Sequence, residues 1–401
     1  MKTIGILENT VQEYAWGSLK AIPDLLGKTN LSQQPQAELW MGAHPKAPSY
    51  VVCDGQKRSL MELIKQYPRE ILGDKTAERF HNELPYLFKV LAAAKPLSIQ
   101  AHPSLDQARE GFRKESAENI PLDAPNRNYK DENHKPECIC ALTPFWALFG
   151  FRTVADIRVH ISKICPLGLA DELAQLNSQP NSEGLKHFFT ALMTLNEKSK
   201  TRIVDETRQN AGRFTHEDAT YQWIMRLLEE NSSDIGVLSP TFLNLIELQP
   251  GQALFLPAGE LHAYLEGVGI ELMANSDNVL RGGLTPKHVD VAELLQVLHF
   301  ESRPVTILEA QIVSKNERSY PSHADEFVLS VITVSDRLAY LSPDLRSVEI
   351  MLCTHGRALL EDIDNQNTVE LNKGSSVVIP AAVRNYRIVG NCTLYKAAVP
   401  I

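Results

Sequence analysis

The stretch Leu248-Gln-Pro-Gly-Gln-Ala-Leu-Phe-Leu-Pro-Ala-Gly259 carries the main fold signal of the chain: a turn glycine, a short apolar run and a second turn that Pro-Ala opens. The same order returns in Leu371-Asn-Lys-Gly-Ser-Ser-Val-Val-Ile-Pro-Ala381. Each copy predicts a turn, a buried strand, a Pro-Ala turn and a following strand. Two copies of such a unit predict two related β-barrels.

The two copies differ at one informative position. His262 stands five residues after the proline of the first copy, whereas Asn385 stands five residues after the proline of the second. Because imidazole is a good metal ligand, this difference predicts one active barrel and one structural barrel. The layout resembles the cupin family of double-sheet jelly rolls. We therefore expect a mainly β fold of two cupin-like jelly-roll β-barrels with a small α-helical domain inserted.

A helical segment interrupts the strand patterns. From about residue 152 to residue 234 the spacing is helical, and the apolar residues between Leu185 and Leu192 fall at i, i+3, i+4 and i+7. The predicted division is 1–150 for the N-terminal part of a catalytic cupin-like domain, 151–238 for a helical domain, 239–318 for the remainder of the catalytic domain, and 319–401 for a C-terminal metal-free cupin-like β domain.

Composition excludes several classes of protein. The 401 residues are 43% hydrophobic and 22% charged, which is ordinary for a globular protein. The net charge is -9 and no basic patch is visible, which argues against a nucleic-acid binder. No apolar run approaches the roughly 18 residues of a membrane span, and Glu8 and Asn9 interrupt the first run too early for a signal peptide. Scattered cysteines indicate buried, reduced thiols. We expect a cytoplasmic monomer that binds neither nucleic acid nor membrane.

Four polar side chains suit a metal site. Gln100 and His102 are two apart on a predicted strand, so they leave the same face. Lys135 and Glu137 share a second face, and His262 follows the Pro-Ala-Gly turn. Two imidazoles and one carboxylate suit zinc. Gln100 has an oxygen to add, but glutamine is an unusual zinc ligand, and composition alone does not nominate it. From spacing alone, histidines and glutamates so far apart are more often unrelated, and both interpretations stay open at this point.

Other polar segments also have two interpretations. Segment 271–287 is polar with twin glycines, as in a loop where backbone approaches a ligand; Arg281 suits an oxyanion and Lys287 a phosphate. A solvated loop has the same composition. Segment 129–135 has the composition of a charged turn. Lys89 lies in an apolar strand, either as an edge lysine or as a buried amine with a lowered pKa.

Taken together, several segments resemble type I phosphomannose isomerases. The matching segments are Gln12–Gly17, Ala37–Pro45, Pro96–Pro103, Tyr129–Glu137 and Ala274–Lys287. The last two are long and specific, whereas the helical insertion and the C-terminal part match weakly.

The resemblance implies a zinc-dependent aldose-ketose isomerase that interconverts D-mannose 6-phosphate and D-fructose 6-phosphate through a cis-enediol. It implies that Gln100, His102, Glu137 and His262 bind one zinc ion per chain, and it gives Arg281 an active-site role. The partner is then a small sugar phosphate. The family fold, two cupin-like barrels with a helical domain between them, agrees with the coarse pattern.

The base that moves the proton stays open. Lys89, Lys135, His134 and Asp277 are candidates, with Lys135 and His134 ahead because their segment adjoins Glu137. A lysine serves only if its surroundings lower its pKa toward neutrality, whereas histidine titrates there unaided. Candidate substrate contacts are Ser98, Lys287 and Tyr264.

Two alternatives keep the same metal site. A cupin-type iron oxygenase needs open coordination positions for oxygen, and a non-catalytic sugar-binding cupin keeps the metal for structure alone. The lysines and arginines near the site favour a phosphorylated substrate over the first alternative. Arg281 and Lys135 argue against the second.

Overall fold

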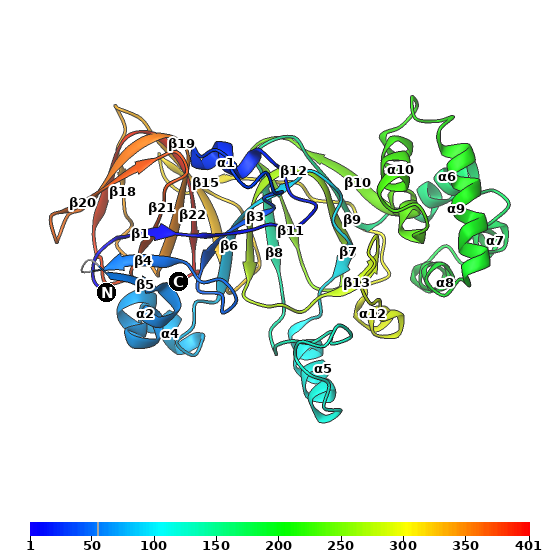
Figure 1. The fold of residues 1–401 in the computed structure, drawn as a ribbon, viewed down its shortest axis with the longest axis horizontal. Coiled ribbons are helices and arrows are strands. Elements are labelled where there is room, and N and C mark those ends of the chain that lie inside the picture. Colours follow the sequence, from blue (N-terminus) through cyan, green and yellow to red (C-terminus); the bar gives the residue numbers. More distant parts are fainter. Residues whose placement is uncertain (54–55) are drawn as a thin grey trace.

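The chain folds mainly into β structure with a helical insertion, as the sequence predicts. The computed structural model describes residues 1–53 and 56–401, and the side chain of Cys53 also lies outside the described part. The strands form two eleven-stranded sheets. Figure 1 shows the sheet rich in C-terminal strands, a central sheet and the group of inserted helices following one another along the long axis.

The central sheet carries the candidate site. Its main path is β14 (Leu308–Glu309), β11 (Gln252–Leu256), β8 (Glu137–Ala141), β12 (His262–Ala274), β6 (Tyr86–Ala93), β3 (Glu38–Gly42) and β2 (Thr10–Gln12). Off this path lie β7 (Ile99–Ala101), β13 (Leu280–Gly283), β9 (Phe145–Phe151) and β10 (Leu243–Leu248). The long strand β12 changes partners along its length, pairing with β7 and β9 at His262 and with β6 and β8 from residue 267 or 269 onward.

The C-terminal sheet also takes in the start of the chain. Its path is β15 (Gln311–Ile312), β16 (Glu317–Ser319), β17 (Val328–Val334), β22 (Tyr386–Ala398), β19 (Glu349–Asp362), β21 (Ser376–Ile379), β1 (Gly5–Glu8), β4 (Tyr50–Cys53) and β5 (Gln56–Ser59), with β18 (Tyr340–Leu341) and β20 (Asn367–Asn372) beside it. Strands β1, β15 and β16 begin within the segments 1–150 and 239–318, and they pair in this sheet.

Across the described residues, each pairing path is open and branched. The strand pairing therefore shows two sheets and not the two closed barrels that we expected. The physical reason is that one long central strand in each sheet pairs with different neighbours at its two ends, so side strands branch off the main path. One apolar core joins the sheets, because Phe88 and Ile270 of the central sheet cluster with Leu329 and Ile350 of the other.

The repeated unit seen in the sequence is visible in the strands. In the first copy a six-residue strand, β10, precedes β11 and the thirteen-residue β12. In the second copy the six-residue β20 precedes β21 and the thirteen-residue β22. His262 begins β12, whereas Asn385 immediately precedes β22 and is exposed.

The inserted helices pack by apolar faces. They are α6 (Val154–Ile164), α7 (Ala170–Ser178), α8 (Ser182–Met193), α9 (Glu197–Ala211), α10 (Ala219–Glu230), the 3-10 turn η1 (Ile235–Leu238) and α11 (Ser239–Phe242). Leu185, Phe188, Phe189 and Leu192 of α8 are buried, as their spacing predicts. The remaining helices are α1 (Ala21–Leu26), α2 (Leu60–Gln66), α3 (Pro68–Leu72), α4 (Asp74–Arg79), α5 (Leu105–Ala117) and α12 (Val291–Val297).

Two expectations from composition can be compared with the described residues. Among them, no helix has the length and apolar character that crossing a membrane requires. The cysteines with described side chains are buried free thiols: Cys138, Cys140, Cys165, Cys353 and Cys392. Burial raises the pKa of Cys140 to about 11, so this thiol stays protonated near neutral pH.

Candidate metal centre

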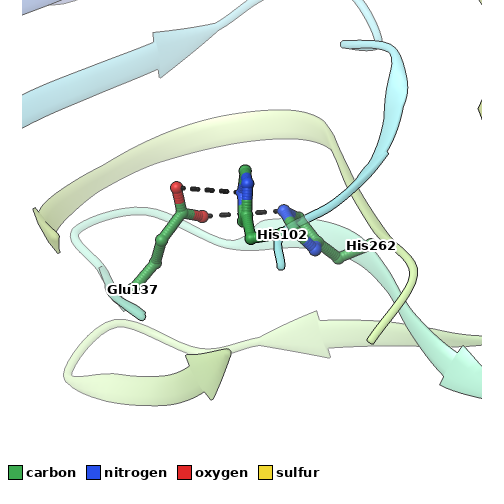
Figure 2. Close-up of side chains that lie close together, drawn as sticks. All are labelled: His102, Glu137 and His262. Carbon is green, nitrogen blue, oxygen red and sulfur yellow. Dashed lines mark ion pairs between the residues drawn. The ribbon is translucent and has the colours of Figure 1, made fainter. Parts of the chain in front are cut away.

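Three side chains from three strands of the central sheet converge on one point. His102 follows β7, Glu137 begins β8 and His262 begins β12. One ligand atom from each lies within 4.8 Å of the others, and all three residues are buried. Nε2 of His102 is 3.4 Å from Glu137 Oε1, and Nε2 of His262 is 3.6 Å from Glu137 Oε2 (Figure 2).

Hydrogen bonds from Nδ1 of each ring fix the orientation and the tautomer of the two imidazoles. Nδ1 of His102 donates to the carbonyl of Asn278 at 2.8 Å, and Nδ1 of His262 donates to the carbonyl of Glu260 at 3.0 Å. A carbonyl only accepts, so each Nδ1 carries the proton and each Nε2 presents a lone pair toward Glu137. Backbone support of this kind is typical of metal-binding histidines.

The charge state of the group also suits a divalent cation. Burial and the Lys135 ammonium lower the pKa of His102, and burial and His102 lower the pKa of His262 to about 4. Burial alone would raise the pKa of Glu137, but Lys135 and His102 hold it well below its usual range. Nε2 of His102 is buried without a hydrogen-bond partner among the described residues. Two neutral imidazoles and one carboxylate with an unpaired nitrogen fit a zinc ion.

Gln100 lies beside the three converging residues. In the sheet it pairs directly with His262 on one side and with Arg281 on the other, so these side chains leave the same face. Its amide nitrogen donates to the Ser98 hydroxyl at 3.1 Å, which leaves the amide oxygen as the atom available to a cation. The Tyr264 hydroxyl lies 3.5 Å from Glu137 Oε2.

A cleft of about 700 Å³ leads to this group. Its lining includes Arg281, Lys287 and Asp277, all of which the sequence nominated. A smaller pocket of about 70 Å³ is lined by Glu137 and His262, and it shares Ser98, Gln100, Lys89 and Lys135 with the cleft. The structure therefore brings most of the predicted site residues together.

Lys135 forms an ion pair with the glutamate of the candidate metal centre. Its Nζ lies 2.9 Å from Glu137 Oε1, and its side chain is 11% exposed. The two side chains lie on the same side, as the sequence predicts, although Lys135 precedes β8 and is not in the strand.

Lys89 is buried between two carboxylates. Its Nζ lies 2.9 Å from Glu271 Oε2 and 3.6 Å from Glu38 Oε1. Burial alone would lower the pKa of Lys89, but Glu271 and Glu38 raise it above its ordinary value. A raised pKa opposes loss of the proton from the Lys89 ammonium, so this arrangement does not favour Lys89 as the base.

Sequence reasoning missed Glu38 and Glu271 as partners of Lys89. Glu271 is the direct cross-strand neighbour of Lys89. Glu38 also accepts a hydrogen bond from Trp40 Nε1 at 2.7 Å. The available signal was a charged residue within each of three apolar strands, since buried charges require partners of opposite sign.

Asp277 is already engaged by a lysine and a histidine. Its carboxylate lies 2.8 Å from Lys46 Nζ and 3.6 Å from His44 Nε2. Burial alone would raise the pKa of Asp277, but the hydrogen bonds from His44 and Lys46 hold it well below its usual range. Asp277 is thus a poor proton acceptor, and His44 and Lys46 are cleft residues that the sequence did not suggest.

His134 does not reach the candidate metal centre. Its Nε2 lies 2.7 Å from Glu326 Oε1, and its ring lines a separate cavity of about 280 Å³ with Arg79 and Asp325. This position does not favour His134, which the sequence placed among the leading base candidates. Its neighbour Lys135 lines the cleft instead, since consecutive side chains of an extended segment point to opposite sides.

Comparisons with known proteins agree with this geometry. A family model described as phosphomannose isomerase type I, catalytic domain, matches residues 4–154. The chain is 43% identical over 378 residues to the mannose-6-phosphate isomerase of Salmonella typhimurium, covering 94% of both chains. It is 34% identical over 407 residues to the human protein of that name, covering 94% of this chain and 93% of the human one.

A solved structure is similar over the whole fold. It is the crystal structure of mannose 6-phosphate isomerase from Salmonella typhimurium bound to its substrate and a zinc atom. The TM-score is 0.92 at 39% identity, and the match covers 99% of this chain and 100% of that one.

Proposed function

The chain belongs to the type I phosphomannose isomerase family, and from this premise we propose that it is a zinc-dependent enzyme that interconverts D-mannose 6-phosphate and D-fructose 6-phosphate. The observation that carries the proposal is the convergence of His102, Glu137 and His262 at the end of a cleft lined by cations. An acidic protein with local cations in one cleft suits an anionic sugar phosphate.

Gln100, His102, Glu137 and His262 are the residues that would hold the zinc ion, one per chain. The unpaired Nε2 of His102 and the carbonyl bonds behind both imidazoles support this assignment. When bound, zinc supplies Lewis acidity and a template for the two substrate oxygens.

Lys135 is the proton carrier that the geometry favours. Two carboxylates pair with the Lys89 ammonium, and Lys46 and His44 contact the Asp277 carboxylate. His134 lines another cavity. A divalent cation at Glu137 would compete with the Lys135 side chain for that carboxylate, which would free the Lys135 amine for the substrate. That amine takes the C2 proton of the open-chain aldose, a cis-enediol forms, and the proton returns to C1.

Two cationic side chains suit the charges of the substrate. Arg281 stands beside Gln100 in the sheet, where its guanidinium stabilises the negative charge that develops on the enediol oxygens. Burial and the nearby Arg281 lower the pKa of Lys287, which lines the same cleft and suits the phosphate group. Ser98 and Tyr264 are further substrate contacts in this proposal.

The finer features of the fold belong to the same proposal. The repeated strand pattern supports two cupin-like units, with a helical domain at 151–238 and a metal-free C-terminal domain at 319–401. We also propose that the protein is a cytoplasmic monomer.

Zinc removal and isotope exchange test the function. A chelator should abolish isomerisation and added zinc should restore it, whereas iron should not be required and no oxygen should be consumed. In deuterated water, deuterium should enter C2 of mannose 6-phosphate or C1 of fructose 6-phosphate. Full activity in a verified metal-free sample would refute the zinc role, and an absence of isomerisation in the zinc-loaded protein would refute the function.

A further inference from the structure

A second cavity lies behind the metal centre. It has a volume of about 380 Å³, and none of its lining residues lines the cleft or the smaller pocket. Its walls come from β9, β11, the turn before His262, and segments near residues 301–308 and 321–323. Most of the wall is apolar: Phe149, Phe255, Leu308 and three prolines. The volume and the apolar wall are typical of a site for a small organic molecule.

One buried carboxylate faces this cavity. Glu260 is only 6% exposed and lines the cavity, yet its carboxylate has no hydrogen-bond or ion-pair partner among the residues that the structure describes. A Cβ built on Gly150, another lining residue with φ of +61°, would lie 3.2 Å from Glu260 Oε2. The missing side chain of Gly150 therefore leaves space beside the carboxylate. A buried carboxylate is costly unless a donor or a cation pairs with it.

The charge of the lining favours a cation. Besides Glu260, the charged lining residues are Glu301 and Arg303, which form an ion pair with each other at the rim and are 53% and 60% exposed. Glu301 and Arg303 compensate each other, which leaves Glu260 as the carboxylate of the lining without a paired cation among the described residues.

We propose that this cavity is a second ligand site, which binds a small organic cation with an apolar or aromatic body. The ammonium or amidinium end pairs with Glu260, and the body packs against Phe149, Phe255 and the prolines. The site adjoins the metal centre, because the backbone carbonyl of Glu260 accepts the Nδ1–H of His262.

Benzamidine is a suitable probe, with benzamide and benzoate as neutral and anionic controls of the same shape. Calorimetric titration of the zinc-loaded protein should show that benzamidine binds at least about tenfold more tightly than benzamide. The reason is that a hydrogen bond between an amidinium and a carboxylate is stronger than one from a neutral amide. Benzoate should bind no better than benzamide. Equal binding of benzamidine and benzamide would overturn the proposal.

Substitutions locate the site and exclude the carboxylates of the cleft. Glu260→Gln should weaken benzamidine at least about tenfold, whereas Glu301→Gln, the same change at the exposed rim, should weaken it less than about threefold. Unchanged binding to folded Glu260→Gln would refute the site. Should that variant fail to fold, Thr306→Trp fills the cavity from an exposed lining position without changing a carboxylate. Loss of binding then supports the site and retention refutes it, and neither result depends on isomerase activity.

Discussion

The two sheets each bury a lysine between two glutamates, and the cluster in the central sheet opens to the cleft described above. In the central sheet, Lys89 lies 2.9 Å from Glu271 and 3.6 Å from Glu38. In the C-terminal sheet, Lys396 lies 2.7 Å from Glu317 and 3.3 Å from Glu349. Both lysines are about equally buried, at 6% and 5% exposed.

The two lysine clusters differ in their surroundings. Lys89 lines both the cleft and the smaller pocket of the metal centre. Around Lys396, the Tyr340 and Tyr386 hydroxyls donate to Glu317 and Glu349, at 2.9 Å and 2.8 Å, and none of the cavities described above includes this lysine. A buried ion cluster is thus no evidence of a reactive site by itself; access to a cavity that holds other reactive groups is what differs.

The largest difference in activity is expected when one buried carboxylate is replaced in each sheet. Glu137→Gln removes the charge between His102 and His262, so kcat/KM should fall at least about 10⁴-fold with loss of bound zinc. Glu349→Gln, in the C-terminal cluster, should leave the kcat/KM of the folded protein within about threefold. Steady-state kinetics and metal analysis check both variants; a Glu137→Gln enzyme with near-normal activity would contradict the assignment.

Replacing each lysine by methionine compares the clusters directly. Lys89→Met leaves Glu271 and Glu38 without their cation, so the free energy of unfolding should fall by about 3–5 kcal/mol. Lys396→Met does the same to Glu317, but Glu349 keeps Arg346 at 3.3 Å, so the fall should be no larger there. Only Lys89→Met should also lower the kcat/KM of the folded protein, by about a hundredfold. Urea unfolding and steady-state kinetics measure the two effects. Equal losses of kcat/KM in the two variants would contradict the prediction that only the Lys89 cluster serves the active site.

Acid should affect the central site through its histidines. In the metal-free protein the pKa of His262 is about 4, below the value of about 6.5 for an unfolded chain. Between these pH values the unfolded chain binds a proton that the native ring does not, so the free energy of unfolding falls as the pH falls. His262 should contribute about 3 kcal/mol to this loss. Urea unfolding of the metal-free protein and of its His262→Gln variant at several pH values tests this contribution. If the free energy of unfolding depends on pH in the same way in both proteins, the lowered pKa of His262 is refuted.

The smallest effect belongs to the position that matches His262 in the second unit. Asn385 is exposed and holds Asp364 through its backbone N–H at 3.2 Å and its side-chain amide at 3.3 Å. Asn385→Ala should therefore cost less than about 1 kcal/mol and leave zinc content and activity unchanged. Thermal unfolding and metal analysis are sufficient; a loss of zinc would mean that the second unit contributes to the metal centre.

Local patterns predicted the elements well. The helical spacing from Leu185 to Leu192 became the buried face of α8, and the strand pattern at residues 138–142 became β8. Such patterns depend on neighbours a few residues apart, and these are visible in the sequence. The pairing of β1 with β21 was not visible, because it joins residues near position 6 to residues near position 378.

The sequence by itself determined the repeated strand unit, the helical insertion and, through the family resemblance, the residues nominated for the metal centre. Only the tertiary structure decided that Lys135 faces Glu137 while His134 faces Glu326, and that two glutamates hold Lys89 as a cation. The physical reason is that the charge of an ionisable side chain is set by burial and by neighbours within a few ångströms, and here those neighbours come from strands that are distant in the sequence.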